Sequence, residues 1–198
     1  MRKMFLIAVA VIFSGVAFAQ SEVDAMLGKL DKYIDNLGPY RISFKLTSED
    51  YTSDGYCLVS GDSYYIGVGD AEVYADGKVR YEVDGARKEI NVDAVNVQSH
   101  NILDNPTRCF DFVGEDYSAE IVKREANKVE IHLSGNDIIE EGDIYITIDK
   151  TTGKPLSILY TLYDDKAYID IVELKSDTTP IKKFLKSAYK GFEIIDFR

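Results

Sequence analysis

The stretch that decides the fold is Gly38-Pro39-Tyr40-Arg41-Ile42-Ser43-Phe44-Lys45-Leu46-Thr47, residues 38–47. From Tyr40 to Thr47 apolar and polar side chains alternate, which is the pattern of a strand with one buried face. Over residues 21–37, apolar residues instead recur every three or four positions, which predicts an amphipathic helix that stops at Gly38-Pro39. The change of period predicts one helix followed by a β-sheet.

The same alternation recurs along the rest of the chain, separated by short turns. Asp76-Gly77, Asp84-Gly85 and Thr152-Gly153 carry residues typical of hairpin turns, and connections this short make neighbouring strands antiparallel. The apolar side chains fall mostly on one face, so we expect a sheet with one wet and one apolar side. Further strands are predicted at about 55–60, 63–68, 71–76, 78–84, 86–92, 109–113, 117–124, 127–134, 142–149, 155–163, 166–174 and 192–197, and two shorter helices at about 93–104 and 179–187.

Residues 1–19, MRKMFLIAVAVIFSGVAFA, have the pattern of a secretory signal peptide. Arg2 and Lys3 precede an apolar run, and Ala17-Phe18-Ala19 has the small residues of a cleavage site. A retained membrane anchor would need about 20 apolar residues, and this run is shorter. We therefore expect an exported protein whose mature chain, residues 20–198, is a single domain.

Export decides how the two cysteines, Cys57 and Cys109, are interpreted. In an oxidising compartment a pair of cysteines more often forms a disulfide than a metal or redox site, and the alternative is two thiols packed in the core. A bridge closing a loop of about 50 residues would stabilise the fold by about 4 kcal/mol through the entropy of the unfolded chain. We predict the disulfide, with a structural role.

Composition and motifs exclude several functions. The chain has 23 Lys and Arg against 34 Asp and Glu, a net charge of -11, which excludes a protein that binds nucleic acid through its phosphates. Its two histidines, His100 and His132, have no metal-ligand spacing, and the carboxylates stand at turns without the spacing of a calcium loop. A nucleophilic pair of His100 and Cys109 is the remaining catalytic arrangement, and the predicted disulfide argues against it. We expect no enzyme, catalytic residue, metal or cofactor.

A curved sheet with one apolar side suggests a binding cavity. Pockets for apolar molecules are concave and lined by aliphatic and aromatic side chains, and each methylene of an acyl chain is worth about 0.8 kcal/mol when buried. An ordinary filled core would produce the same alternation, so periodicity leaves both interpretations open.

The order of these features resembles the LolA-like family of periplasmic lipoprotein carriers, which includes LolB, LppX and RseB. The resemblance covers nearly all of the mature chain, and the Tyr-rich strands and the C-terminal sequence are most similar to the branch of the Bacteroides group. It is carried, after the signal peptide and the helix at 21–37, by Tyr40-Arg41-Ile42-Ser43-Phe44-Lys45-Leu46, Gly55, Tyr74-Ala75-Asp76-Gly77-Lys78, Asn101-Ile102-Leu103-Asp104-Asn105-Pro106, Asp149-Lys150-Thr151-Thr152-Gly153-Lys154-Pro155 and Gly191-Phe192-Glu193-Ile194-Ile195-Asp196-Phe197-Arg198.

The resemblance implies a mainly β protein with helices (α+β): a strongly curved, unclosed antiparallel β-barrel of about eleven strands, with helices plugging its concave side. It implies a monomeric periplasmic carrier that binds lipoprotein acyl chains and ferries them from the inner to the outer membrane. Its partners would be an inner-membrane release complex and an outer-membrane acceptor. The alternative is an RseB-like sensing module for lipids or lipoproteins, with no transport role.

The strand phase then selects the residues expected to line the acyl cavity. The first helix would act as a lid and face the cavity with Leu27, Leu30 and Ile34. The Arg that latches the lid in well-studied carriers aligns with Gly61, so Arg41 and Arg80 are the candidates to replace it. The expected lining residues are Tyr40, Ile42, Phe44, Leu46, Tyr64, Ile66, Tyr81, Ile144, Ile146, Ile148, Ile158 and Tyr160.

Overall fold

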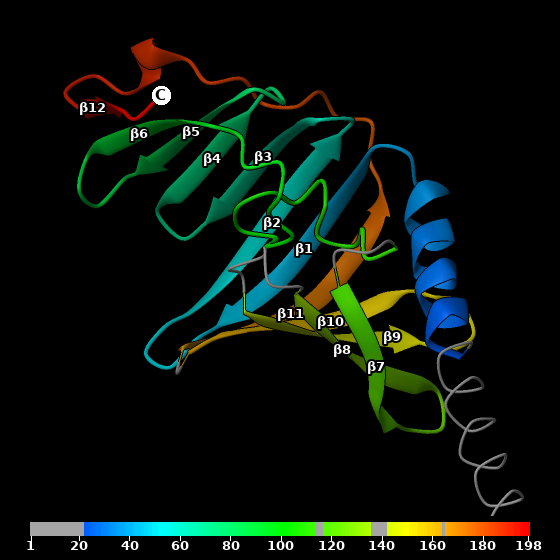
Figure 1. The fold of residues 1–198 in the computed structure, drawn as a ribbon. Helices are drawn as coiled ribbons and strands as arrows, with labels where there is room; N and C mark the ends of the chain where they lie inside the picture. Colours follow the sequence, from blue (N-terminus) through cyan, green and yellow to red (C-terminus); the bar gives the residue numbers. More distant parts are fainter. Residues whose placement is uncertain (1–21, 114–116, 136–141, 164) are drawn as a thin grey trace, which may run out of the picture.

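The computed structural model describes residues 22–113, 117–135, 142–163 and 165–198. The predicted signal peptide, residues 1–19, lies outside these ranges. The described chain forms a helix over residues 22–35, one sheet of twelve strands and a short 3-10 helix, η1 (Lys186–Ala188) (Figure 1). Within the described ranges, we find no helix with the length and apolar character needed to cross a membrane.

The twelve strands account for most of the described chain. They are β1 (Tyr40–Thr47), β2 (Thr52–Ser60), β3 (Ser63–Val68), β4 (Ala71–Ala75), β5 (Val79–Asp84), β6 (Glu89–Ala94), β7 (Tyr117–Arg124), β8 (Lys128–Gly135), β9 (Asp143–Asp149), β10 (Pro155–Leu162), β11 (Asp165–Ser176) and β12 (Glu193–Asp196).

The sheet consists of two meanders joined by β1. Its order is β12-β6-β5-β4-β3-β2-β1-β11-β10-β9-β8-β7, and all neighbours are antiparallel except β12, which runs parallel to β6. On β1, Tyr40 pairs with Val59 of β2 on one side and with Ser176 of β11 on the other. The sheet curls strongly but does not close, so β7 and β12 are its edges (Figure 1).

The predicted fold class, a mainly β protein with a curved and unclosed antiparallel sheet, is confirmed. The prediction that its apolar residues face one side is wrong for half of the sheet. A large core, the concave cluster, joins one face of β1–β4 and β7–β11 to the helix. A second core, the convex cluster, lies on the opposite face of β2–β6 and contains Leu58, Tyr65, Tyr74, Val83, Ile90 and Val92.

Two segments that we predicted as regular structure are irregular. Residues 95–113, here called the covering loop, contain turns where we predicted the rest of a helix at 93–104 and a strand at 109–113. The side-chain oxygens of Asn101 and Asn105 accept hydrogen bonds from the backbone N–H groups of Leu103 and Thr107. Such side-chain bonds compete with the backbone hydrogen bonds of a helix or strand. The prediction of a helix at 179–187 is also wrong, because residues 179–185 have no regular structure. Residues 177–198 form the C-terminal segment, which ends in β12.

Candidate functional site

The concave cluster brings together the predicted lining residues, with one exception. Ile42, Ile144, Ile146, Ile148 and Ile158 are completely buried, and the rest of the group is no more than 7% exposed. The residues that meet in this cluster are Tyr40, Ile42, Phe44, Leu46, Tyr64, Ile66, Ile144, Ile146, Ile148, Ile158 and Tyr160.

Tyr81 is the exception. It pairs with Tyr74 across β4 and β5 and packs with the convex cluster, stacked on Phe184 at 4.2 Å between ring centroids. On β5 the apolar residues Val79, Tyr81 and Val83 share the convex face, so their neighbour Arg80 points to the concave side. The predicted cavity position of Tyr81 is therefore wrong.

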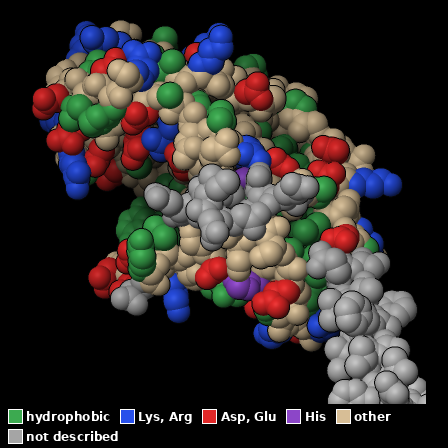
Figure 2. Space-filling view, in the orientation of Figure 1, with side chains coloured by type: hydrophobic (Ala, Val, Ile, Leu, Met, Phe, Trp, Pro, Cys, Tyr) green, Lys and Arg blue, Asp and Glu red, His purple; other side chains and the backbone are tan. Residues whose placement is uncertain are grey.

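The helix and the covering loop close the concave face. From the helix, Leu27 and Leu30 belong to the concave cluster and Ile34 packs against it, so the predicted lid residues do face the sheet. From the covering loop, Ile102 and Phe110 are buried in the same cluster. The concave face is filled by the protein's own side chains in this conformation. On the part of the described surface visible in Figure 2, apolar side chains are scattered among charged ones.

Three tyrosine hydroxyls on the sheet tie down the covering loop. Tyr40 donates to the carbonyl of Pro106 at 3.1 Å, and Tyr64 donates to the carbonyl of Asp104 at 2.8 Å. Tyr160 donates to the carbonyl of His100 at 3.1 Å and accepts the N–H of Ile102 at 3.0 Å. Burial raises the pKa of Tyr40 and Tyr64, so both stay protonated and remain donors.

Arg80 adds a charged tie to the same loop. Its Nε lies 3.4 Å from a carboxylate oxygen of Asp104, and its Nη1 donates to Glu82 at 2.8 Å. Arg41, the other candidate for a latch, stacks over the ring of Tyr56 on the convex face at 4.3 Å. Gly61 lies in the turn between β2 and β3, where a Cβ would meet no described atom within 4 Å. Of the predicted candidates, Arg80 is therefore the one that contacts the cover.

Cys57 of β2 and Cys109 of the covering loop are both free thiols and both completely buried. The predicted disulfide is not present in this structure. Burial raises the pKa of both thiols, and a negative charge on Cys57 would raise the pKa of Cys109 further. A catalytic cysteine needs a lowered pKa, so Cys109 lacks the character of a nucleophile.

His100 is likewise a structural residue of the cover. Its side chain is completely buried, its Nδ1 lies 3.2 Å from the hydroxyl of Tyr117, and its ring stacks near Phe112. These contacts hold the end of the covering loop against the first residue of β7. The sequence showed His100 only as a candidate metal ligand or nucleophile partner and did not predict this contact, because no local spacing links residues 100 and 117.

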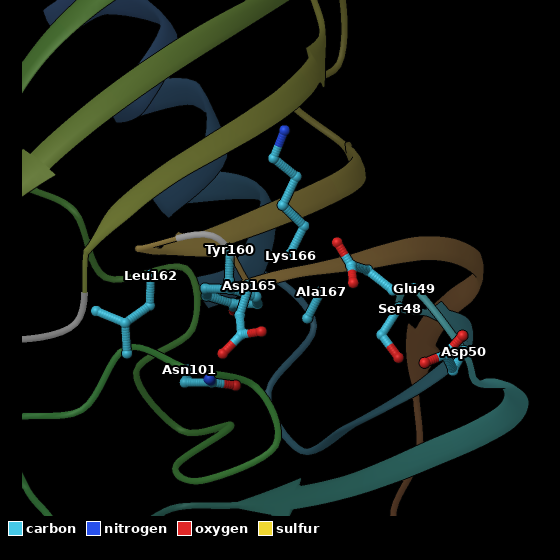
Figure 3. Close-up of a pocket in the computed structure, with 9 residues that line it drawn as sticks. All are labelled: Ser48, Glu49, Asp50, Asn101, Tyr160, Leu162, Asp165, Lys166 and Ala167. Atoms are coloured by element: carbon cyan, nitrogen blue, oxygen red, sulfur yellow. The ribbon is translucent and has the colours of Figure 1, made fainter.

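A pocket of about 550 Å³ lies beside the concave cluster (Figure 3). Tyr160 is both a lining residue and a tie of the covering loop, while Asn101 brings the loop itself to the pocket. Glu49 and Asp50 from the turn between β1 and β2, and Asp165 from the start of β11, bring three carboxylates to its lining, beside Lys166. We call it the rim pocket, and it is lined by Ser48, Glu49, Asp50, Asn101, Tyr160, Leu162, Asp165, Lys166 and Ala167. A second pocket of about 360 Å³ lies between the helix, at Leu27 and Gly28, and Phe112 of the covering loop.

Comparisons with known proteins bear on the fold. No protein-family model matches the sequence, and no curated protein matches it. An uncharacterized conserved protein from Thermus thermophilus has the same fold, with a TM-score of 0.52 and 9% identity over 87% of this chain and 97% of that one.

Two other solved structures align less well. One is a LolA superfamily protein from Nitrosomonas europaea, with a TM-score of 0.42 and 8% identity over 87% of this chain and 97% of that one. The other is a putative outer membrane lipoprotein-sorting protein domain from Vibrio parahaemolyticus, with a TM-score of 0.44 and 8% identity over 86% and 97%. The protein has the architecture that the resemblance to the LolA-like family implies, a curved unclosed sheet with a helix against its concave side.

Proposed function

We propose that this protein is a non-enzymatic periplasmic carrier that binds the acyl chains of lipoproteins on its concave face. The observation that carries the proposal is the nature of the cover. A largely apolar concave face is closed by an irregular loop, which tyrosine hydroxyls and Arg80 hold in place of regular structure continuous with the sheet. Such a segment can leave and return without disturbing the strands beneath it.

The energies of opening and binding are of similar size. Each hydroxyl–carbonyl bond contributes about 0.5–1.5 kcal/mol net, and uncovering a side chain such as Ile102 or Phe110 costs about 1.5–3 kcal/mol. An acyl chain that buries about a dozen methylenes regains about 10 kcal/mol. The cost of opening the cover would offset most of the gain from burying the acyl chain, so the net affinity would be moderate. Moderate affinity suits a carrier that must give up its cargo to an acceptor.

The rim pocket is the proposed entrance. It adjoins the covering loop at Asn101 and the concave cluster at Tyr160, so a chain entering there meets first the segment that must move. The polar carboxylates around it would stay in contact with water and with the peptide part of a lipoprotein.

The two cysteines would regulate the opening. Cys57 lies on the sheet and Cys109 on the covering loop, so the predicted disulfide would fasten the cover to β2. Oxidised protein should bind acyl chains less well than reduced protein, and Cys57→Ser should abolish that difference. The comparison uses one sequence in two redox states, which keeps the acyl site itself unchanged.

The experiment that tests the proposal is displacement of a fluorescent apolar probe from reduced protein, residues 20–198, by a triacylated lipopeptide. The unacylated peptide is the control ligand. We expect displacement by the acylated form alone, with tighter probe binding by Arg80→Gln, which loosens the cover. Failure of the probe to bind wild type and Arg80→Gln alike would show that the concave face is a permanent core, and would overturn the proposal.

Transfer is tested next. A carrier should deliver bound lipoprotein to outer-membrane vesicles, whereas an RseB-like sensing module would bind without delivery and form a stable complex with a membrane regulator. Charged substitutions at Phe44 or Ile146 are unsuitable here, because both side chains are buried and a charge would unfold the protein.

A further inference from the structure

The covering loop, the irregular green trace in Figure 1, is bonded to itself as well as to the sheet. At its neck, the place where its two ends meet, the Asn105 amide donates to the carbonyl of Asn96 at 3.0 Å. Beside it, Arg108 Nη1 donates to the carbonyl of Val97 at 2.6 Å. Residues 96–108 therefore form a compact loop whose ends lie together, which is the arrangement of an Ω-loop.

Turns inside the covering loop add further bonds that do not involve the sheet. The carbonyl of Asn101 accepts the backbone N–H groups of Asp104 at 2.9 Å and of Asn105 at 2.8 Å. The side-chain oxygen of Asn105 accepts the hydroxyl of Thr107 at 2.6 Å. Because Asn105 is 2% exposed, its polar side chain needs partners, and the loop itself provides them. A buried polar network that is satisfied in this way holds one conformation.

The bonds from the covering loop to the sheet form a separate group. The hydroxyls of Tyr40, Tyr64 and Tyr160, described above, come from strands, and the N–H of Ile102 donates to Tyr160 at 3.0 Å. The N–H of Ile102 is thus bonded to the sheet, whereas the N–H of Asn105 is bonded within the loop. Breaking the first group of bonds would leave the second group in place.

We propose that the covering loop opens as one prefolded unit, and that Asn105 and Arg108 are positioning residues that keep its shape while it is off the sheet. The inference rests on the proposed carrier function, which requires the loop to leave and return. A unit that keeps its internal bonds loses less conformational entropy on closing than a loop that unfolds each time. The side chain of Ile102 would then return to the concave cluster already in position.

Amide hydrogen exchange of the reduced protein, resolved residue by residue, tests the proposal. Tyr64→Phe removes a bond between loop and sheet, so it should raise the exchange rate of Ile102 by about threefold or more and leave that of Asn105 unchanged. Arg108→Met removes a bond at the neck and should raise the rate of Asn105 by about threefold or more. The matched control, Arg87→Met in the exposed turn between β5 and β6, should change neither rate.

Two results would overturn the proposal. Equal acceleration of Ile102 and Asn105 in Tyr64→Phe would show that the loop unfolds when it opens. An Arg108→Met variant in which Asn105 exchanges at the wild-type rate would show that the neck does not hold the loop together. Either result leaves the carrier function standing, because displacement of the apolar probe decides that function separately.

A second measurement uses unaltered protein and serves if a substitution unfolds the loop. Exchange is compared in the presence of saturating triacylated lipopeptide and of the unacylated peptide. A loop displaced as one unit loses the protection of Ile102 and keeps that of Asn105. Loss of protection at both residues contradicts the prefolded unit. No change at either residue, although the probe is displaced, would show that the loop does not open for an acyl chain and would overturn the proposal as well.

Discussion

Gly55 faces the ring of Phe44 across the first hairpin. The two residues are paired in register, and a Cβ at Gly55 would lie 2.6 Å from Cε2 of Phe44 and 2.8 Å from Cγ2 of Val68. The phenyl ring therefore occupies the space that any other residue at position 55 would need. This contact explains at atomic detail why a glycine stands in the middle of a strand.

Replacement of Gly55 by alanine should destabilise the protein by about 1–3 kcal/mol, because Phe44 and Val68 must shift in a packed core. The matched control is Gly28→Ala in the exposed part of the helix. There no atom lies within 4 Å of the new Cβ, and helix propensity should stabilise the fold by up to about 1 kcal/mol. Urea unfolding measures both, and equal effects of the two substitutions would contradict the packing account.

Tyr64→Phe removes one tie of the covering loop and leaves the ring in place. The carbonyl of Asp104 loses its hydroxyl donor, so we expect about 1 kcal/mol lower stability and stronger binding of an apolar dye. Tyr163→Phe is the control, since that side chain is 96% exposed. Lowered stability with unchanged dye binding in Tyr64→Phe would show that the Tyr64 hydroxyl stabilises the fold but does not hold the covering loop closed.

At the scale of elements, the covering loop and the strands should differ in local stability. Amide hydrogen exchange of residues 101–107 should be faster by orders of magnitude than that of Ile42 or Ile146, because the loop is held by few hydrogen bonds whereas the strands are held on both sides. Equal protection of loop and strands would mean that the cover opens only with global unfolding.

The strands could be predicted from the sequence where one face is apolar and the other polar. Residues 40–47 and 143–149 alternate without exception, so their phase and their cavity-facing residues were predictable. The covering loop was not, because Phe110 and Phe112 alternate like strand residues although they are buried as a cover. Whether an alternating segment becomes a strand or a cover depends on whether it pairs with a distant strand. The local sequence pattern carries no information about that pairing.

The helix predicted at residues 179–187 and the position of Tyr81 were wrong for a shared reason. Ile181, Phe184 and Ala188 have helical spacing, yet Ile181 and Phe184 pack against the convex face from a non-helical backbone. Tyr81 fits an alternating strand, but alternation gives two faces and does not say which one is concave. The switch of the apolar face at β5 could be recognised only once the segment that covers it was placed.

Glu72 makes the attachment of the C-terminal segment dependent on pH. Burial alone would raise its pKa, but hydrogen bonds from Tyr65, Tyr189 and Tyr74 lower it below the ordinary value. The carboxylate therefore stabilises the fold above about pH 4.3, its unfolded pKa, and this stabilisation is lost as pH falls through the lower folded pKa.

Comparison of Glu72→Gln with wild type isolates this effect from the other carboxylates. Urea unfolding should show the wild type as more stable at pH 7, with the difference shrinking as the pH falls from about 4.3 through the lowered folded pKa of Glu72. Glu89→Gln, on β6, is the control for an added amide. A difference that stays constant from pH 7 to pH 3 would contradict the role of the Glu72 charge.

For the molecule as a whole, β2, β3 and β4 are the strands with buried clusters on both faces. Cys57 and Leu58 of β2 belong to opposite clusters, as do Tyr64 and Tyr65 of β3. The two cores therefore share a single layer of backbone. A substitution that loosens the packing of one core also affects the other through β2 and β3. Stability at these strands should set the global unfolding free energy.

The position of β1 at the middle of the sheet has a consequence for how the chain acquires its structure. The hairpins from β2 to β6 and from β7 to β11 join segments close in sequence, whereas Tyr40 must find Ser176, 136 positions further along the chain. Contacts of such separation pay the largest loop-closure entropy and slow the rate of folding. During synthesis the side of β1 that later meets β11 has no partner until residues 165–176 have been made. The open edge of β1 is then the site at which a nascent chain needs protection from aggregation.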